Sequence, residues 1–179
     1  MIRHTVRALC AASLVIAPLA LSTPAHAATV CTVNGLSSPD GNVTGTAGND
    51  YIECASVDSG DTVNGLGGAD MIVLTGPVGG TVSAGDGRDY VHVTEDGTVS
   101  GTVGAGADGD YVEVEGSIAP GAKVYGDAGN DYLRILANFG VVQAGTDSSR
   151  VLAKGGVVDA GTGFDLCRVV GDTPSNCEL

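Results

Sequence analysis

Residues 45–52 read GTAGNDYI, and their small-x-x-Gly-x-Asp-x-aliphatic pattern returns six more times along the chain. The closest further copies are residues 65–72 (GLGGADMI), 84–91 (AGDGRDYV), 105–112 (AGADGDYV) and 126–133 (GDAGNDYL). Residues 144–151 (AGTDSSRV) and 160–167 (AGTGFDLC) are two weaker copies. The copies recur at intervals of 20, 19, 21, 21, 18 and 16 residues, which is typical of a repeat architecture.

An aspartate stands at one fixed position in every copy except the sixth, and we call this position the anchor. The anchors are Asp50, Asp70, Asp89, Asp110, Asp131, Ser149 and Asp165. A valine stands seven residues before every anchor and a small residue five before it, while apolar or cysteine residues stand two and four after it. These offsets have the period of two that places side chains on one face of a strand. Each copy therefore predicts a strand, a tight glycine turn and a second strand.

Nearly all the variation in repeat length falls in a second, looser turn, such as residues 75–81 and 115–122. Repeats that differ only in one outside turn stack as the coils of a solenoid. The sequence thus predicts an all-β fold, a parallel β-solenoid of about seven two-strand coils with a thin core of Val, Ile and small residues. An immunoglobulin-like sandwich is the alternative, but fixed offsets across seven copies favour the solenoid.

The N-terminal segment has the features of a secretory signal peptide. Residues 1–27 hold Arg3 and Arg7, then an apolar stretch, then an Ala-His-Ala ending at Ala27. A buried N-terminal helix is the alternative interpretation. We expect a secreted, extracellular protein whose residues 28–179 form a single β-solenoid domain, with no membrane insertion.

The net charge of the chain excludes some classes of binding partner. The 179 residues include 21 acids and 8 bases, and removal of residues 1–27 leaves 6 bases against the same 21 acids, a net charge of −15. So acidic a chain predicts no nucleic-acid partner and no anionic membrane surface. Four cysteines remain near the two ends, and their proximity in sequence favours Cys31–Cys54 and Cys167–Cys177 disulfides that staple the ends of the domain.

The anchors point to a cation. In a parallel stack, equivalent residues lie about 4.8 Å apart, so the anchors form a column of carboxylates that repel one another. Calcium accepts oxygen ligands at about 2.3–2.6 Å, and two oxygens on opposite sides of one ion would match that spacing. Oxygen-only ligation disfavours zinc or copper, because His92 is the only histidine after residue 27.

These loops resemble the haemolysin-type (RTX) calcium-binding nonapeptide G-G-x-G-x-D-x-U-x, which forms a parallel β-roll. The resemblance is best in GTAGNDYIE, GLGGADMIV and GDAGNDYLR and covers roughly residues 43–170. It implies a secreted bacterial protein that holds Ca²⁺ between successive Gly-Asp loops. The implied metal ligands are the side chains of Asp50, Asp70, Asp89, Asp110, Asp131 and Asp165, with loop glycines Gly48, Gly68, Gly87 and Gly129.

The chain departs from that family in three ways. Family repeats recur every nine residues, whereas these recur about every twenty, so only one edge of the solenoid qualifies for calcium. Asp108 replaces a loop glycine and Ser149 replaces an anchor aspartate. The toxins of that family carry a C-terminal export signal, whereas this chain has the features of an N-terminal one, and this difference argues against a toxin function here. The alternative role for the aspartates is to cap tight turns without metal.

A second candidate surface is a row of tyrosines. Tyr51, Tyr90, Tyr111 and Tyr132 each follow an anchor directly and face away from the core. They either stack across strands to stabilise that face or bind a surface glycan or protein partner. The sequence holds no nucleophile elbow, phosphate loop or metal-hydrolase motif, so we expect a protein that is not an enzyme.

Overall fold

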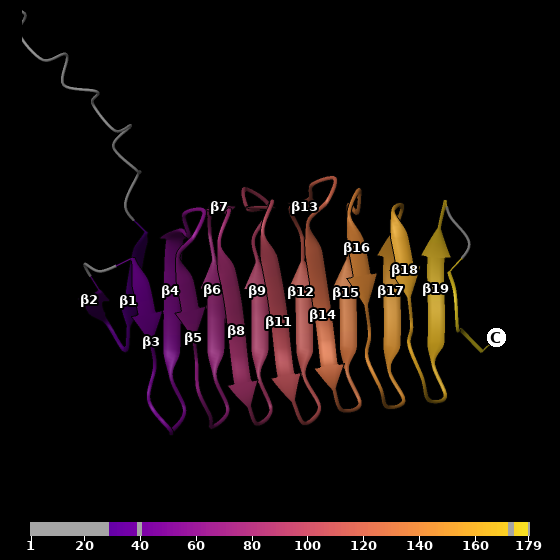
Figure 1. Ribbon diagram of the computed structural model, residues 1–179, viewed down its shortest axis with the longest axis horizontal. Helices are drawn as coiled ribbons and strands as arrows, with labels where there is room; N and C mark the ends of the chain where they lie inside the picture. Colours follow the sequence, from indigo (N-terminus) through magenta and orange to yellow (C-terminus); the bar gives the residue numbers. More distant parts are fainter. Residues whose placement is uncertain (1–28, 39–40, 172–173, 179) are drawn as a thin grey trace, which may run out of the picture.

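The computed structural model describes residues 29–38, 41–171 and 174–178, so the predicted signal peptide lies outside the described residues. Every regular element in those ranges is a β-strand, and two long sheets face each other along the whole stack (Figure 1). None of the described segments forms a helix long and apolar enough to cross a membrane.

Three sheets build the fold. The nine-stranded sheet contains, in spatial order, β19 (Leu166–Val170), β17 (Arg150–Lys154), β15 (Tyr132–Ile135), β12 (Tyr111–Val114), β9 (Tyr90–Val93), β6 (Met71–Leu74), β4 (Tyr51–Ser56), β1 (Val30–Val33) and β2 (Leu36–Ser38). The seven-stranded sheet contains β18 (Val157–Asp159), β16 (Val141–Gln143), β14 (Lys123–Ala128), β11 (Thr102–Ala107), β8 (Thr81–Asp86), β5 (Thr62–Asn64) and β3 (Asn42–Thr44). The three-stranded sheet contains β13 (Ser117–Ile118), β10 (Thr98–Val99) and β7 (Pro77–Val78).

Each sequence copy forms one coil, as predicted. A strand of the seven-stranded sheet runs into the anchor turn, and a strand of the nine-stranded sheet runs out of it. Equivalent residues pair in parallel register: Val103 pairs with Val82 and Val124, and Val112 pairs with Val91 and Leu133. Seven strand–turn–strand units, joined by six connections, give about six full turns. The prediction of a parallel β-solenoid is confirmed.

The three-stranded sheet is an addition that the sequence did not predict. It lies in the looser turn, on the edge opposite the anchors, and its Val78, Val99 and Ile118 are buried. These side chains close the core at that edge in the middle coils. Two-residue strands are too short to show a period in the sequence, which is why the pattern indicated only a loose turn.

The core is a set of aliphatic rows between the two long sheets. The valines seven before each anchor and the residues two after it are almost all inaccessible, with Val82, Val103, Val112 and Leu133 at 0% exposure. Small residues five before the anchors keep the sheets close at the anchor edge. No Phe, Tyr or Trp belongs to this core in the described chain, which fits the low aromatic content.

Both ends of the stack are closed by non-repeat segments. At the N-terminal end β1 pairs antiparallel with β2 and β4, and Cys31 is bonded to Cys54. At the C-terminal end the segment 174–178 lies along the last coil, and Cys177 is bonded to Cys167. Both predicted disulfide pairings are confirmed.

The alternation along β16 predicts a sharp difference between two neighbouring valines. Val142 has no exposed surface, whereas Val141 points outward and is partly exposed. Val142→Ala should lower the free energy of unfolding by about 1.5–3 kcal/mol. Val141→Ala should change it by less than about 0.5 kcal/mol. Urea denaturation of both variants measures this, and equal losses would contradict the assigned inward face.

Candidate functional site

The anchors form one buried column at the tight-turn edge. Asp50, Asp70, Asp89, Asp110 and Asp131 are 3–4% exposed, Ser149 is 4% exposed and Asp165 is inaccessible. Each follows the glycine turn that leaves the seven-stranded sheet and precedes a strand of the nine-stranded sheet. The predicted column of side chains is therefore present, and it lies inside the turn.

A chain of hydrogen bonds runs along the column in one direction. Oδ1 of each aspartate accepts the backbone N–H of the anchor in the preceding coil. The N···O distances are 2.8 Å from Asp50 to Asp70, 2.8 Å from Asp70 to Asp89, 2.8 Å from Asp89 to Asp110 and 2.9 Å from Asp110 to Asp131. Because these N–H groups are buried, each needs an acceptor, and the next coil supplies it.

Ser149 continues this chain with a neutral group. Its Oγ accepts the N–H of Asp131 at 3.1 Å, and its own N–H donates to Oδ1 of Asp165 at 2.7 Å. The carboxylate of Glu178 then accepts the N–H of Asp165 at 2.6 Å and ends the column. At the other end, Nδ2 of Asn34 donates to Oδ1 of Asp50 at 2.6 Å. Sequence reasoning missed Asn34 and Glu178, because both lie outside the repeat and carry no register signal.

Asp50 differs from the other anchor aspartates in the hydrogen bonding of its second carboxylate oxygen, Oδ2. Oδ2 of Asp50 accepts the N–H of Thr46 at 2.5 Å. In contrast, the buried Oδ2 atoms of Asp70, Asp89, Asp110, Asp131 and Asp165 have no hydrogen-bond partner among the described residues. Burying a charged oxygen without a hydrogen-bond partner costs free energy, so a proton or another positive charge must accompany these carboxylates.

Burial disfavours the ionised form of the central anchors. Desolvation raises the pKa of Asp89 to about 6, of Asp110 to about 7 and of Asp131 to about 6, although the N–H donors partly oppose it. Desolvation also raises the pKa of Asp70. The Thr46 backbone N–H instead lowers the pKa of Asp50 below its ordinary value. The middle of the column therefore favours a proton or another positive charge.

The predicted glycines have a structural role in the turns. Gly68, Gly87 and Gly129 have φ of 117°, 120° and 137°, and a Cβ on any of them would overlap the backbone of the preceding coil. Gly48 lies in the first anchor turn and has room for a Cβ. Asp108, which replaces a glycine in this row, has a φ of 76° and is exposed. The glycines thus permit coils to stack at close range, whether or not their carbonyl groups ligate a metal.

Other acids do not complete a cluster. Asp86, Asp108, Asp127 and Asp147 are exposed on the outside of the loops. Within the described residues, no three Asp, Glu, His or Cys side chains converge in a way that could hold a metal ion. The column therefore offers one carboxylate per coil.

The tyrosines contact one another on the outer face of the nine-stranded sheet. The ring centroids of Tyr90 and Tyr111 are 5.2 Å apart and those of Tyr111 and Tyr132 are 4.9 Å apart. The Tyr90 hydroxyl donates to Glu113 at 2.8 Å, and Arg150 lies over the Tyr132 ring. Met71 stands between Tyr51 and Tyr90 in the row. The ring faces therefore contact neighbours, which favours the cross-strand stacking role over an open glycan platform.

The fold and the column together define a class of protein: a disulfide-capped parallel β-solenoid with a buried aspartate ladder. No known family model, curated protein or solved structure matches the chain. The resemblance to RTX repeats consequently rests on the loop residues themselves.

The raised pKa values predict how stability depends on pH in chelator. Aspartate side chains in the unfolded chain have a pKa near 3.9, whereas the carboxyl groups of Asp89, Asp110 and Asp131 have a pKa of about 6 to 7 in the folded protein. Between about pH 4 and pH 7 the folded chain holds more protons than the unfolded chain. The free energy of unfolding should therefore fall as pH rises through this window.

Denaturation at pH 4.5, 6 and 8 in chelator measures this dependence. Asp110→Asn keeps an Oδ1 acceptor for the Asp89 N–H but has no carboxylate to ionise. It should flatten the fall relative to the unsubstituted protein. If the unsubstituted protein became more stable from pH 4.5 to pH 8, or if Asp110→Asn left the slope unchanged, burial of the ionised carboxylate would not be the dominant effect.

Proposed function

We propose that the protein is a secreted calcium-binding β-solenoid in which Ca²⁺ at the aspartate column stabilises the stacked coils, in a non-catalytic role. The observation that carries the proposal is the line of five buried Oδ2 atoms without a hydrogen-bond partner among the described residues. Carboxylate oxygens are hard ligands of the kind that calcium prefers.

The hydrogen bonds between coils do not explain why six of the seven anchors are aspartates, which can carry a negative charge. Ser149 shows that a neutral side chain satisfies the buried N–H of the preceding anchor. Six other coils nevertheless carry a carboxylate, and within the described chain no lysine or arginine forms an ion pair with any of them. The additional oxygen and its charge are what a metal would use.

The two oxygens of the anchor carboxylates have different roles in the proposed site. Oδ1 of each aspartate holds the neighbouring coil, and Oδ2 is left for the ion at Asp70, Asp89, Asp110, Asp131 and Asp165. Backbone carbonyl groups of the adjacent glycine loops are the remaining oxygen donors at this edge. A bound calcium would supply positive charge that lowers the repulsion along the column. Asp50 is the weakest candidate, because Thr46 already occupies its Oδ2.

The proposed location follows from independent features. Both disulfides are of the kind that forms in an oxidising compartment. Extracellular calcium modules work at about 10⁻⁴–10⁻³ M, where a site that stabilises the fold stays occupied. Residues 1–27 have the composition of an export signal.

Calorimetric titration with calcium, together with thermal melts in calcium, magnesium and chelator, tests the proposal. We expect calcium to raise the melting temperature at pH 7.5 and to lose most of this effect at pH 5, where protons compete for the central carboxylates. Asp110→Asn should weaken calcium binding at least about tenfold, since it removes a ligand charge. Asp50→Asn is the matched control and should weaken it much less.

The opposite results are equally clear. If calcium released no heat and left the melting temperature unchanged at pH 7.5, the aspartates would act only as turn caps. If Asp50→Asn and Asp110→Asn weakened binding equally, the ion would not depend on the oxygens that lack a partner.

A further inference from the structure

The outer face of the nine-stranded sheet is an uncovered surface with an ordered arrangement of side chains. From β4 to β19, one outward residue of each strand forms what we call the middle row. Paired strand by strand, the middle row is Glu53, Val73, His92, Glu113, Arg134, Leu152 and Arg168. A second outward row, which we call the tyrosine row, is Tyr51, Met71, Tyr90, Tyr111, Tyr132, Arg150 and Leu166.

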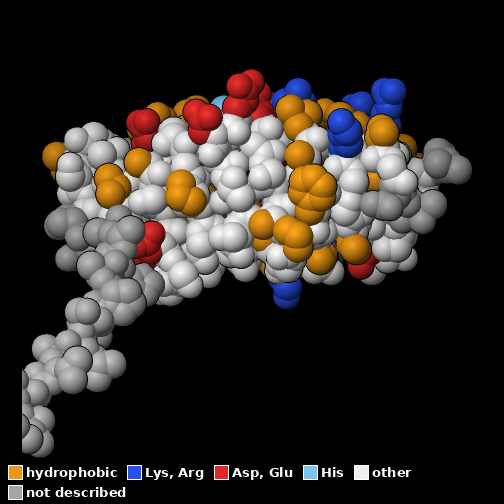
Figure 2. Space-filling model, turned by 90° about the horizontal axis from the view of Figure 1, so that it is seen from above, with side chains coloured by type: hydrophobic (Ala, Val, Ile, Leu, Met, Phe, Trp, Pro, Cys, Tyr) orange, Lys and Arg blue, Asp and Glu red, His pale blue; other side chains and the backbone are white. Residues whose placement is uncertain are grey.

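Charge is segregated along this face. Of the six lysines and arginines after residue 27, four lie on β15, β17 and β19: Arg134, Arg150, Lys154 and Arg168. On the N-terminal side Glu53 lies on β4, and Glu95 and Asp96 lie in the loop after β9. Glu113 and Glu115 lie on or directly after the central strand β12. Figure 2 shows acidic side chains along the N-terminal half of its upper rim and basic side chains toward the C-terminal end.

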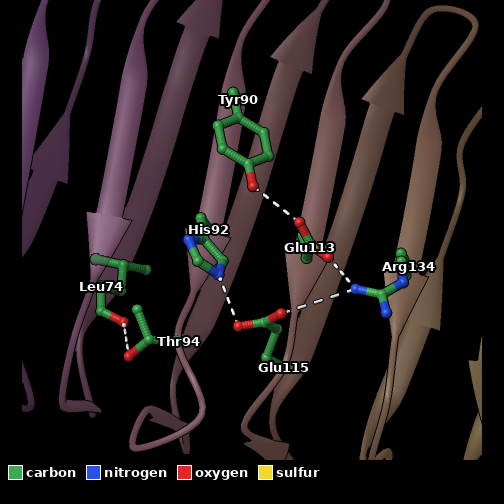
Figure 3. A network of polar contacts seen from close by, with 7 residues as sticks. All are labelled: Leu74, Tyr90, His92, Thr94, Glu113, Glu115 and Arg134. Atoms are coloured by element: carbon green, nitrogen blue, oxygen red, sulfur yellow. Dashed lines mark hydrogen bonds and ion pairs between the residues drawn. The ribbon is translucent and has the colours of Figure 1, made fainter.

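The charged side chains in the middle of the face are paired with one another. Arg134 forms ion pairs with Glu113 and, at 3.9 Å, with Glu115, and His92 lies 3.2 Å from Glu115 (Figure 3). The charges at the two ends differ in this respect. Among the described residues, neither Glu53 nor Lys154 nor Arg168 forms an ion pair. The face therefore ends in a free acid on one side and free bases on the other.

Apolar side chains accompany the end charges. Tyr51 and Met71 are 41% and 42% exposed beside Glu53, while Leu166 and Val170 are 48% and 58% exposed beside Arg168. Shallow depressions flank Leu152, lined by Arg134, Lys154 and Arg168 on one side and by Arg150 and Leu166 on the other. Exposed apolar groups beside unpaired charges are the composition of a protein interface.

We propose that a second copy of the chain packs face to face on this surface, related by a two-fold axis that is parallel to the strands and lies between the two faces, in front of β12. β12 is the middle one of the seven parallel strands, with three on either side. The rotation keeps each row level and reverses the strand order, so β4 faces the partner's β19 and β6 faces the partner's β17.

Four pairs of positions match under this rotation. In the middle row, Glu53 lies opposite the partner's Arg168, and Val73 lies opposite the partner's Leu152. In the tyrosine row, Tyr51 lies opposite the partner's Leu166, and Tyr90 lies opposite the partner's Tyr132. Each end contact occurs twice because a two-fold interface is isologous. At these positions opposite charge meets opposite charge and apolar meets apolar. Nearer the axis, His92 lies opposite the partner's Arg134, Met71 lies opposite the partner's Arg150, and Glu113 lies opposite its own copy. The matched positions are what favour a two-fold dimer on this face.

The size of the face sets the strength of the dimer. Seven strands at about 4.8 Å spacing and four residues at about 3.3 Å give a face of roughly 30 Å by 13 Å. Counted on both copies this is roughly 800 Å², which is below the about 1,200 Å² at which stable specific interfaces begin and is the size of a weak, transient contact. We therefore expect a dimer whose population depends on protein concentration and falls with added salt.

Charge-reversal variants, measured by analytical ultracentrifugation, test the proposed dimer. Glu53→Arg and Arg168→Glu should each raise the dimer dissociation constant at least about tenfold, because each places like charges in two symmetric contacts. The double variant restores both contacts and should dimerise like the unsubstituted protein. An equimolar mixture of the two single variants should form the heterodimer, since each variant then supplies what the other lacks.

The control is Lys123→Glu, which makes the same charge change on the exposed face of the seven-stranded sheet. It should leave the dissociation constant unchanged, and thermal melts confirm that every variant is folded. The proposal is overturned if the unsubstituted protein is monomeric at about 1 mM, where even weak association would be detected. It is also overturned if the double variant or the mixture stays monomeric. Monomers that bind an acidic polysaccharide or anionic vesicles, and lose that binding in Arg168→Glu, would assign the basic end to such a partner instead.

Discussion

The buried N–H of each anchor is the constraint on which the stack depends. It lies inside a turn, away from water, and its acceptor in the described structure comes from the next coil. Every coil must therefore present an oxygen at this position, and an aspartate, Ser149 or Glu178 does so. Register, burial and direction along the solenoid all follow from this requirement. The carboxylates meet it with more charge than a hydrogen-bond acceptor needs, and that excess is the basis of the proposed cation site.

The sequence predicted the parts of the structure that repeat. Valines seven before each anchor and apolar residues after it gave the two long sheets, their register and the inward faces, because seven copies reinforce one signal. It could not predict β7, β10 and β13, whose length is too short for periodicity. It also could not show that, in every anchor aspartate after Asp50, one carboxylate oxygen bonds to the preceding coil while the other has no hydrogen-bond partner among the described residues. That division depends on side-chain orientation, which residue spacing does not encode.

Net charge is a poor guide to local surfaces in such a fold. A value of −15 after residue 27 describes the field far from the molecule. A parallel stack converts sequence order into position along an axis, so residues late in the chain gather at one end. Arg134, Arg150, Lys154 and Arg168 are spread over 35 positions in sequence yet occupy three adjacent strands. A small number of bases thus gives a strongly polar face on an acidic protein.

The two closed ends determine how long the molecule can be. The terminal strands of the parallel repeat, β3, β4, β18 and β19, carry the same backbone groups as the strands between them, and without a covering segment they could pair with a further coil. At one end the β1–β2 hairpin is held to β4 by Cys31–Cys54, and at the other the segment 174–178 is held by Cys167–Cys177. Each disulfide ties a short non-repeat segment covalently to a terminal coil, over an edge that could otherwise pair with another strand. With both end segments held in place, fewer strand edges are left open at the two ends of the stack, which disfavours end-to-end association of the oxidised protein.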